Sequence, residues 1–244
     1  MSALTYTRYE LLRTLRNRRF LLLSLIFPLI LYFVVAGPRA HDRVEGTAIS
    51  WALYYMVGLA SFGTMSAMLS SGARIATERQ AGWNRQLRIT PLRPFAYFRA
   101  KVLTGYMMAL ISLAALYVAG VALGVSLAGS QWLELTALML AGLVPFAALG
   151  ITLGHLLTPD SIGPAMGGGI SLLALLGGTW FPLGHSGFLF HLAQYLPSYW
   201  LVQASHVALG GAPWPLKGWL VIAAWTAILA RVAQRAYRRD TGRV

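Results

Sequence analysis

Residues 102–127 read VLTGYMMALISLAALYVAGVALGVSL and contain no charged side chain. A helix that crosses the hydrocarbon core of a bilayer needs about 20 consecutive, mostly apolar residues. This stretch meets that length with residues to spare. It therefore predicts a transmembrane helix, and the rest of the chain follows the same pattern.

The composition of the whole chain indicates the same class of protein. Hydrophobic residues make up 57% of the 244 residues and charged residues only 11%, whereas soluble domains contain about 45–50% apolar and about 25% charged residues. A soluble fold of this size could not cover so many apolar side chains. The chain also has no cysteine, which excludes disulfides, thiolate metal sites and cysteine nucleophiles. We therefore expect an integral membrane protein.

Five further segments have the length and apolar character of membrane spans. They are residues 20–36, 51–71, 133–157, 162–183 and 218–236. Together with residues 102–127 they predict an all-α integral membrane protein with six transmembrane helices, in which residues 1–244 form a single transmembrane domain.

The basic residues are distributed unevenly among the predicted loops. The chain has 20 Lys and Arg against 7 Asp and Glu, a formal charge of +13. Only Arg39, Arg43 and Lys217 lie outside the leader, the loop between the second and third spans, and the C-terminal tail. Because Lys and Arg concentrate in cytoplasmic loops, both termini are expected in the cytoplasm and the chain in the cell (plasma) membrane. The charge follows this topology, so we expect no nucleic-acid partner.

Two segments differ from plain spans and loops. Residues 4–19 are amphipathic and basic, which predicts an interfacial helix in contact with membrane lipids; the alternative is a solvated leader that only sets topology. Residues 186–209 are too apolar for a solvated loop and are interrupted by Pro197. They predict two short helices, 186–195 and 198–209, in the outer leaflet.

The loop between the second and third spans contains both arginines and apolar residues. Residues 78–89 predict a short helix that ends before Pro91, because proline disfavours helix in the residue before it. Trp83 and Leu87 give this helix an apolar side, which suits docking of a soluble partner at the cytoplasmic face. The alternative is that the arginines simply hold the loop inside.

Glycines recur at a spacing of four within the third, fourth and fifth spans. Such spacing lets helix backbones approach closely in membranes, so we expect these spans to pack tightly. The pairs are Gly120/Gly124, Gly150/Gly154 and Gly163/Gly167.

The sequence lacks the residues that would supply energy or catalysis. Its two lysines precede Val102 and Gly218, so there is no GK[ST] phosphate loop, and no carboxylate lies at mid-bilayer depth. The histidines show no metal-ligand spacing. We assign no catalytic residue, no metal and no enzymatic activity to this chain, and expect its energy to come from a partner.

These features together resemble the ABC-2-type permeases, the membrane subunits of one class of ABC exporters. The family's loop between spans 2 and 3 typically reads Glu-Arg, a nearby Gly, then Leu and a Thr-Pro-Leu turn. In this chain Lys101 follows that loop, at the start of the next span. Gly177-Gly178 with Phe181-Pro182, and Leu196-Pro197, also resemble the family pattern. The corresponding loop residues, which the resemblance implies form the ATPase-coupling interface, are Glu78, Arg79, Gly82, Trp83, Leu87, Thr90, Pro91 and Leu92.

The resemblance implies two separate ATP-binding subunits, which would bind ATP and Mg²⁺ in place of this chain, and a second permease chain, identical or paralogous. The translocation path would lie between the permeases and be lined by spans 1, 2 and 5. Span 2 offers two neighbouring faces for it, one with Tyr54, Ser61 and Met65 and the other with Tyr55, Phe62 and Ser66.

The residues predicted for the path carry no charge, and an unpaired charge in the bilayer costs at least ~2.5–3.5 kcal/mol. We therefore expect an apolar or amphipathic cargo, such as a lipid, a lipopeptide or a hydrophobic drug, exported from the cytoplasm or inner leaflet. The alternatives are a sensing or scaffold protein that binds a ligand without moving it, and an intramembrane enzyme that uses His155 and Asp160.

Overall fold

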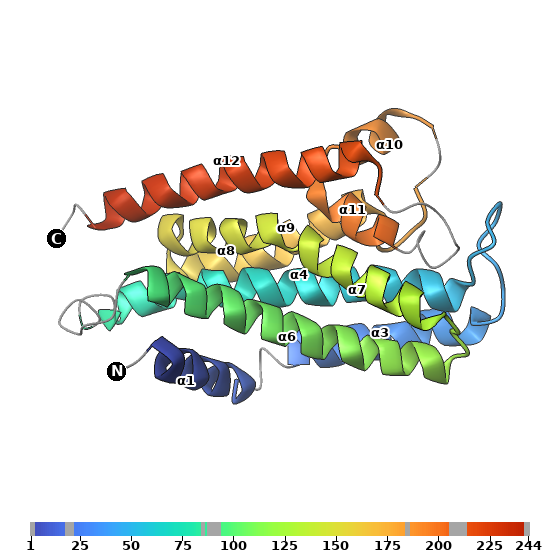
Figure 1. The fold of residues 1–244 in the computed structure, drawn as a ribbon, viewed down its shortest axis with the longest axis horizontal. Coiled ribbons are helices and arrows are strands. Elements are labelled where there is room, and N and C mark those ends of the chain that lie inside the picture. Colours follow the sequence, from blue (N-terminus) through green and yellow to red (C-terminus); the bar gives the residue numbers. More distant parts are fainter. Residues whose placement is uncertain are drawn as a thin grey trace.

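The computed structural model describes residues 3–17, 22–83, 86, 94–183, 186–204 and 214–241. Their regular structure is helical, and the long helices lie side by side in one bundle (Figure 1). The helices are α1 (Ala3–Leu15), η1 (Leu22–Ile26), α3 (Phe27–Ala36), η2 (Gly37–Arg39), α4 (Trp51–Gln80), α6 (Pro94–Ala122), α7 (Gly129–Gly142), α8 (Val144–Leu156), α9 (Pro159–Gly177), α10 (Phe188–Ala193), α11 (Pro197–Gln203) and α12 (Leu216–Thr241).

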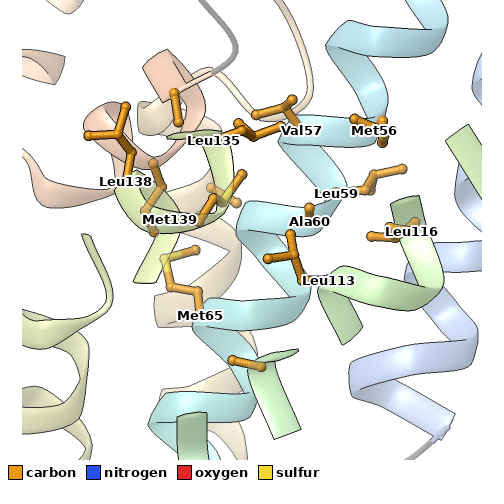
Figure 2. Packing of buried hydrophobic residues seen from close by; sticks show 14 of the residues in the cluster. Met56, Val57, Leu59, Ala60, Met65, Leu113, Leu116, Leu135, Leu138 and Met139 are labelled. Atoms are coloured by element: carbon orange, nitrogen blue, oxygen red, sulfur yellow. The ribbon is translucent and has the colours of Figure 1, made fainter. Parts of the chain in front are cut away.

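The 30-residue helix α4 runs through the middle of the bundle and contacts α3, α6, α8 and α9. Ser50 caps its N-terminus by accepting a hydrogen bond from the Leu53 amide at 3.2 Å, as expected of an N-cap serine. Figure 2 shows Met56 and Leu59 beside Leu116 of α6. Nearly all of the most apolar part of α4 is buried inside the chain, so α4 forms the centre of the core.

Glycine brings α4 and α8 into backbone contact. A Cβ atom at Gly150 would lie 2.8 Å from the Leu69 carbonyl oxygen, and one at Gly154 would lie 2.5 Å from the Gly72 carbonyl oxygen. The Gly150/Gly154 pair thus packs closely against α4, the second predicted span. The Gly163/Gly167 pair differs, because a Cβ at either position would meet no atom within 4 Å.

Among the described residues, four helices are long and apolar enough to cross a membrane: Trp51–Gln80, Phe95–Ala122, Gly129–Leu156 and Leu216–Arg239. The first predicted span corresponds to a shorter apolar helix, Ser24–Arg39, and residues 20 and 21 lie outside the described residues. The fifth corresponds to α9, whose prolines, Asp160 and glycines lower its apolar character.

Several boundaries differ from the sequence prediction. The second span was expected to end at residue 71, but α4 continues to Gln80 and is about 45 Å long, more than the ~30 Å hydrocarbon core. The third span begins earlier, at Pro94. The fourth divides at Leu143 into α7 and α8, because Pro145 lacks the amide hydrogen that would continue the helix.

The short helices lie at the two ends of the bundle. The helix α1 and the C-terminal end of α12 lie at one end, and α10 and α11 at the other (Figure 1). Both outer helices are shorter than predicted: α11 ends at Gln203, and residues 205–213 lie outside the described residues. The helix α1 spans Ala3–Leu15, whereas the interfacial helix was predicted over residues 4–19, of which 18 and 19 lie outside the described residues.

Candidate functional site

Charged side chains are buried where α1, α4 and α6 meet. Lys101 Nζ lies 2.6 Å from Glu10 Oε1 and 2.6 Å from Glu78 Oε1, and these side chains are 1%, 4% and 2% exposed. The Tyr97 hydroxyl donates to Glu78 Oε2 at 2.6 Å, and Arg13 Nη1 lies 3.1 Å from Glu78 Oε1. We call these five residues the ion cluster.

The cluster holds two carboxylates and two cations, so its formal charges balance. An isolated buried ion would be strongly unfavourable, and pairing with good hydrogen-bond geometry offsets that cost. Burial by itself raises the pKa of the Glu10 carboxyl, but Lys101, Arg74 and Arg13 outweigh this effect and leave the pKa below its ordinary value of 4.5. Glu10 is therefore held as a carboxylate.

On α1 and α6 the residues of the ion cluster lie three or four positions apart, so they share one face of each helix. Tyr97 and Lys101 are four residues apart on α6 and so lie on one face. Tyr6, Ile75 and Ala100 form an apolar group together with Tyr97. This apolar surrounding lowers the local dielectric and strengthens the ion pairs. The cluster thus fixes α1 onto the ends of α4 and α6.

This geometry corrects the expected position of Glu78. The helix predicted over residues 78–89 does not begin at Glu78, because α4 continues to Gln80 and the chain then turns at Ala81 and Gly82. Gly82 has a φ of +70°, a conformation that glycine adopts without strain. The Glu78 side chain points into the protein and bonds Lys101, so it is not a surface group of this chain.

Arg79, the second predicted coupling residue, also bonds within the chain. Its Nη1 donates to the carbonyl oxygens of Gly154 at 3.2 Å and His155 at 2.7 Å. These are among the last carbonyls of α8, which lack partners within their own helix. Arg79 therefore ties the end of α4 to the end of α8.

The remaining predicted coupling residues follow this turn. Trp83 is partly buried and packs against the apolar group beside the ion cluster. Leu87, Thr90, Pro91 and Leu92 lie outside the described residues. Of the predicted coupling residues that follow α4, the structure thus describes Gly82 and Trp83, which come four and five residues after Glu78 of the ion cluster.

A cavity of about 430 Å³ lies next to the ion cluster, lined by α4, α9, Asn17, Ser24 and Phe27. Small-molecule sites commonly have volumes of about 300–1,000 Å³. Its α4 residues share one face over about 22 Å of helix, and they are Phe62, Ser66, Ser70, Ala73, Arg74 and Thr77.

The cavity changes character along its length. At one end the Phe27 and Phe62 rings lie 6.2 Å apart. At the other end are Asn17, Arg74 and Thr77. The wall formed by α9 is mostly apolar and includes Gly163, Met166, Gly167 and Ile170. The cavity is therefore apolar at one end and polar at the other.

The structure separates the two faces of α4 that were predicted for the path. Ser61 and Met65 are buried in the core, where Ser61 Oγ donates to the Val57 carbonyl oxygen at 2.8 Å and Met65 is drawn among the core residues of Figure 2. Tyr54 is buried and donates to the Gly178 carbonyl oxygen. Phe62 and Ser66 line the cavity, while Tyr55 stacks on Trp51.

Several residues of both sites were missed from the sequence. Glu10 was not singled out, although it is the leader's only acidic residue, and this scarcity was an available signal. Ser70, Arg74 and Thr77 continue the spacing of Phe62 and Ser66, but they lie at or beyond the end predicted for the second span. A stripe of polar residues at helical spacing could have identified them.

The two residues considered for an intramembrane enzyme occupy different surroundings. The His155 ring packs beside Phe98 and Tyr237, with centroid distances of 5.9 and 5.6 Å. Asp160 is exposed in the first turn of α9. His155 therefore packs among aromatic rings, and the structure shows no contact between His155 and Asp160 in the described residues.

Comparison with known proteins agrees with this architecture. A family model described as ABC-2 family transporter protein matches residues 42–233, a range that contains α4, α9 and Lys101. The protein YvfS of Bacillus subtilis (strain 168), which carries the name of a transport permease, is 27% identical over 236 residues that cover 95% of each chain. The family match begins after α1 and α3, so it contains the α4, α6 and α9 residues of the two sites and not those from residues 10–27. The chain belongs to the ABC-2 transporter family and is a multi-pass membrane subunit of an ABC transporter.

Proposed function

We propose that this chain is the permease of an ATP-driven exporter in the cell membrane, and that it moves an apolar or amphipathic cargo out of the cytoplasm or inner leaflet. Two ATP-binding subunits would dock on the loop that begins at Gly82 and Trp83. The observation that carries the proposal is the mostly apolar cavity along α4, which lies between the segments expected to line the path.

A second permease chain would complete the path. Gly163 and Gly167, four residues apart on one face of α9, are exposed, and a Cβ at either would meet no atom within 4 Å. Helices with small residues on one face pack closely against other helices in membranes. This open face of α9 borders the cavity, so a partner chain packed on it would enclose the cargo between the two permeases.

The proposal is tested by purifying the tagged chain from its native host. We expect an ATP-binding subunit to copurify, and the reconstituted complex to hydrolyse ATP faster with amphipathic compounds than with small hydrophilic solutes. Recovery of the chain without any ATP-binding subunit would instead favour a sensing or scaffold function. Stimulation by hydrophilic solutes alone would contradict the proposed class of cargo.

Six membrane crossings with both termini in the cytoplasm give a prediction about labelling. Single cysteines at Ser2 and Gly242 should resist a membrane-impermeant thiol reagent in intact cells, whereas a cysteine at Gly187 should react. The chain has no cysteine of its own, so each signal reports one position. Labelling of Gly242 from outside would contradict the six crossings.

The coupling loop gives a second prediction. Leu87→Asp should abolish the stimulation of ATP hydrolysis by the permease, because a charge replaces the apolar contact expected with the ATP-binding subunit. The matched control is Leu189→Asp on α10, an exposed leucine at the opposite end of the bundle, which should retain stimulation. Equal stimulation in both variants would show that this loop is not the coupling element.

A further inference from the structure

The cavity contains one charged group among the described residues that line it, the guanidinium of Arg74. Arg74 lies on the same face of α4 as Ser66 and Ser70, at the polar end of the cavity. Its Nη1 donates to Thr14 Oγ1 at 2.5 Å, which fixes the side chain where α4 passes α1. A charged side chain that lines a mostly apolar cavity is unfavourable unless it is hydrated, hydrogen-bonded or paired with an opposite charge.

Arg74 helps to hold the nearby Glu10 as a carboxylate, but in the described residues it forms no direct ion pair within 4.0 Å with Glu10 or Glu78. Glu10 and Glu78 bond to Lys101 at 2.6 Å. A guanidinium has five N–H donors, and the hydroxyl of Thr14 satisfies one of them. Arg74 therefore has both charge and donors to offer to a ligand in the cavity.

We propose that the α4–α9 cavity binds an anionic amphiphile, with its acidic head group at Arg74 and its apolar chain against Phe27, Phe62 and the glycine-bearing face of α9. An oxyanion head accepts charge-assisted hydrogen bonds from arginine, often in pairs. The apolar chain replaces water along the rest of the cavity. The length of the α4 face, about 22 Å, suits a single extended chain.

This inference deepens the proposed function, since it names an acidic head group for the cargo, but binding itself requires neither ATP nor a partner subunit. The experiment is therefore equilibrium binding to the purified permease alone, in nanodiscs of phosphatidylcholine. The probes are dodecyl phosphate, dodecanol and dodecylamine, which share one apolar chain and differ in the charge of the head. We expect dodecyl phosphate to bind at least about tenfold more tightly than the other two.

Substitution of Arg74 tests the head-group contact. Arg74→Gln should weaken dodecyl phosphate about tenfold and leave dodecanol unchanged, whereas Arg74→Lys should retain most of the preference for the anion. Arg8→Gln, which removes an exposed arginine from α1, is the control for general surface charge. Equal loss of dodecyl phosphate in Arg8→Gln and Arg74→Gln, or no loss in Arg74→Gln, would overturn the proposal.

A second pair of variants tests the apolar part of the cavity on α9 and leaves Arg74 and its contacts unchanged. Gly167→Leu places a side chain in the cavity, and Gly168→Leu adds the same side chain to the next residue of α9, which does not line the cavity. Neither added Cβ meets an atom within 4 Å, so both variants should fold. Gly167→Leu should weaken dodecyl phosphate and dodecanol about tenfold relative to Gly168→Leu, and equal binding by the two variants would overturn the proposal.

The same assay distinguishes the two sources of an anionic amphiphile. Replacing half of the phosphatidylcholine with phosphatidylglycerol should displace dodecyl phosphate from the wild type if a membrane lipid occupies the cavity. Unchanged binding would indicate a free amphiphile that enters from the cytoplasm. Either result supports the site, provided that Arg74→Gln removes the preference for the anion.

Discussion

Lys101→Met should destabilise the protein by about 3–5 kcal/mol, the range for removing one partner of a buried ion pair. The substitution leaves the carboxylates of Glu10 and Glu78 buried without the ammonium that lies 2.6 Å from each. Methionine keeps the length of the side chain, so the loss is mainly electrostatic. The measurement is unfolding of the purified protein by SDS in mixed micelles.

The chain offers a matched control, because it has only two lysines. Lys217→Met removes an exposed lysine at the opposite end of the bundle, and exposed charge interactions contribute about 0–1 kcal/mol. The triple variant Glu10→Gln/Lys101→Met/Glu78→Gln should recover much of the lost stability, because it leaves no buried charge unpaired. Equal stability of Lys101→Met and Lys217→Met would show that the ion cluster does not stabilise the fold.

Gly154→Ala should destabilise the protein by about 1–3 kcal/mol, the usual cost of overpacking a core. The added Cβ would lie 2.5 Å from the Gly72 carbonyl oxygen and 2.7 Å from Ile75 Cβ, so α4 and α8 must separate. The measurement is thermal unfolding of the purified permease in detergent.

Gly163→Ala is the control for this substitution. It makes the same chemical change in a helix, but its Cβ would meet no atom within 4 Å. Alanine favours the helix over glycine by up to about 1 kcal/mol, so Gly163→Ala should be neutral or stabilising. The prediction for Gly154 is contradicted if both variants unfold at the temperature of the wild type.

The helical membrane architecture could be predicted because apolar runs are local. A stretch such as residues 102–127 is recognised by its length and composition. Small-residue spacing indicated that the helix with Gly150 packs closely against another helix, but it did not identify α4 as that neighbour. The same spacing at Gly163 did not predict a contact within the chain. Spacing describes the surface that a helix presents, whereas the neighbour that meets this surface is determined by the tertiary fold.

The ends of the spans and the two sites depended on distant parts of the chain. The end of α4 was placed too early, at residue 71, before the charged residues Arg74, Glu78 and Arg79. A window of sequence does not contain the partners of these charges. Lys101 is 23 residues from Glu78 and 91 from Glu10, so only the folded chain brings them together. The Glu78 side chain, expected near the coupling interface, therefore lies in the interior of this chain.

The central position of α4 has a consequence for how the protein is made in the membrane. Of the four long apolar helices of the described residues, α4 is the least apolar and the most completely buried. Chains are synthesised from the N-terminus, so α4 enters the bilayer before α6 and α8 exist to cover it. During this interval its serines and glycines face lipid, and the nascent chain exposes a surface that membrane chaperones and proteases can recognise. Arrival of α8 against Gly72 covers part of that surface, and α9, which also contacts α4, covers more of it.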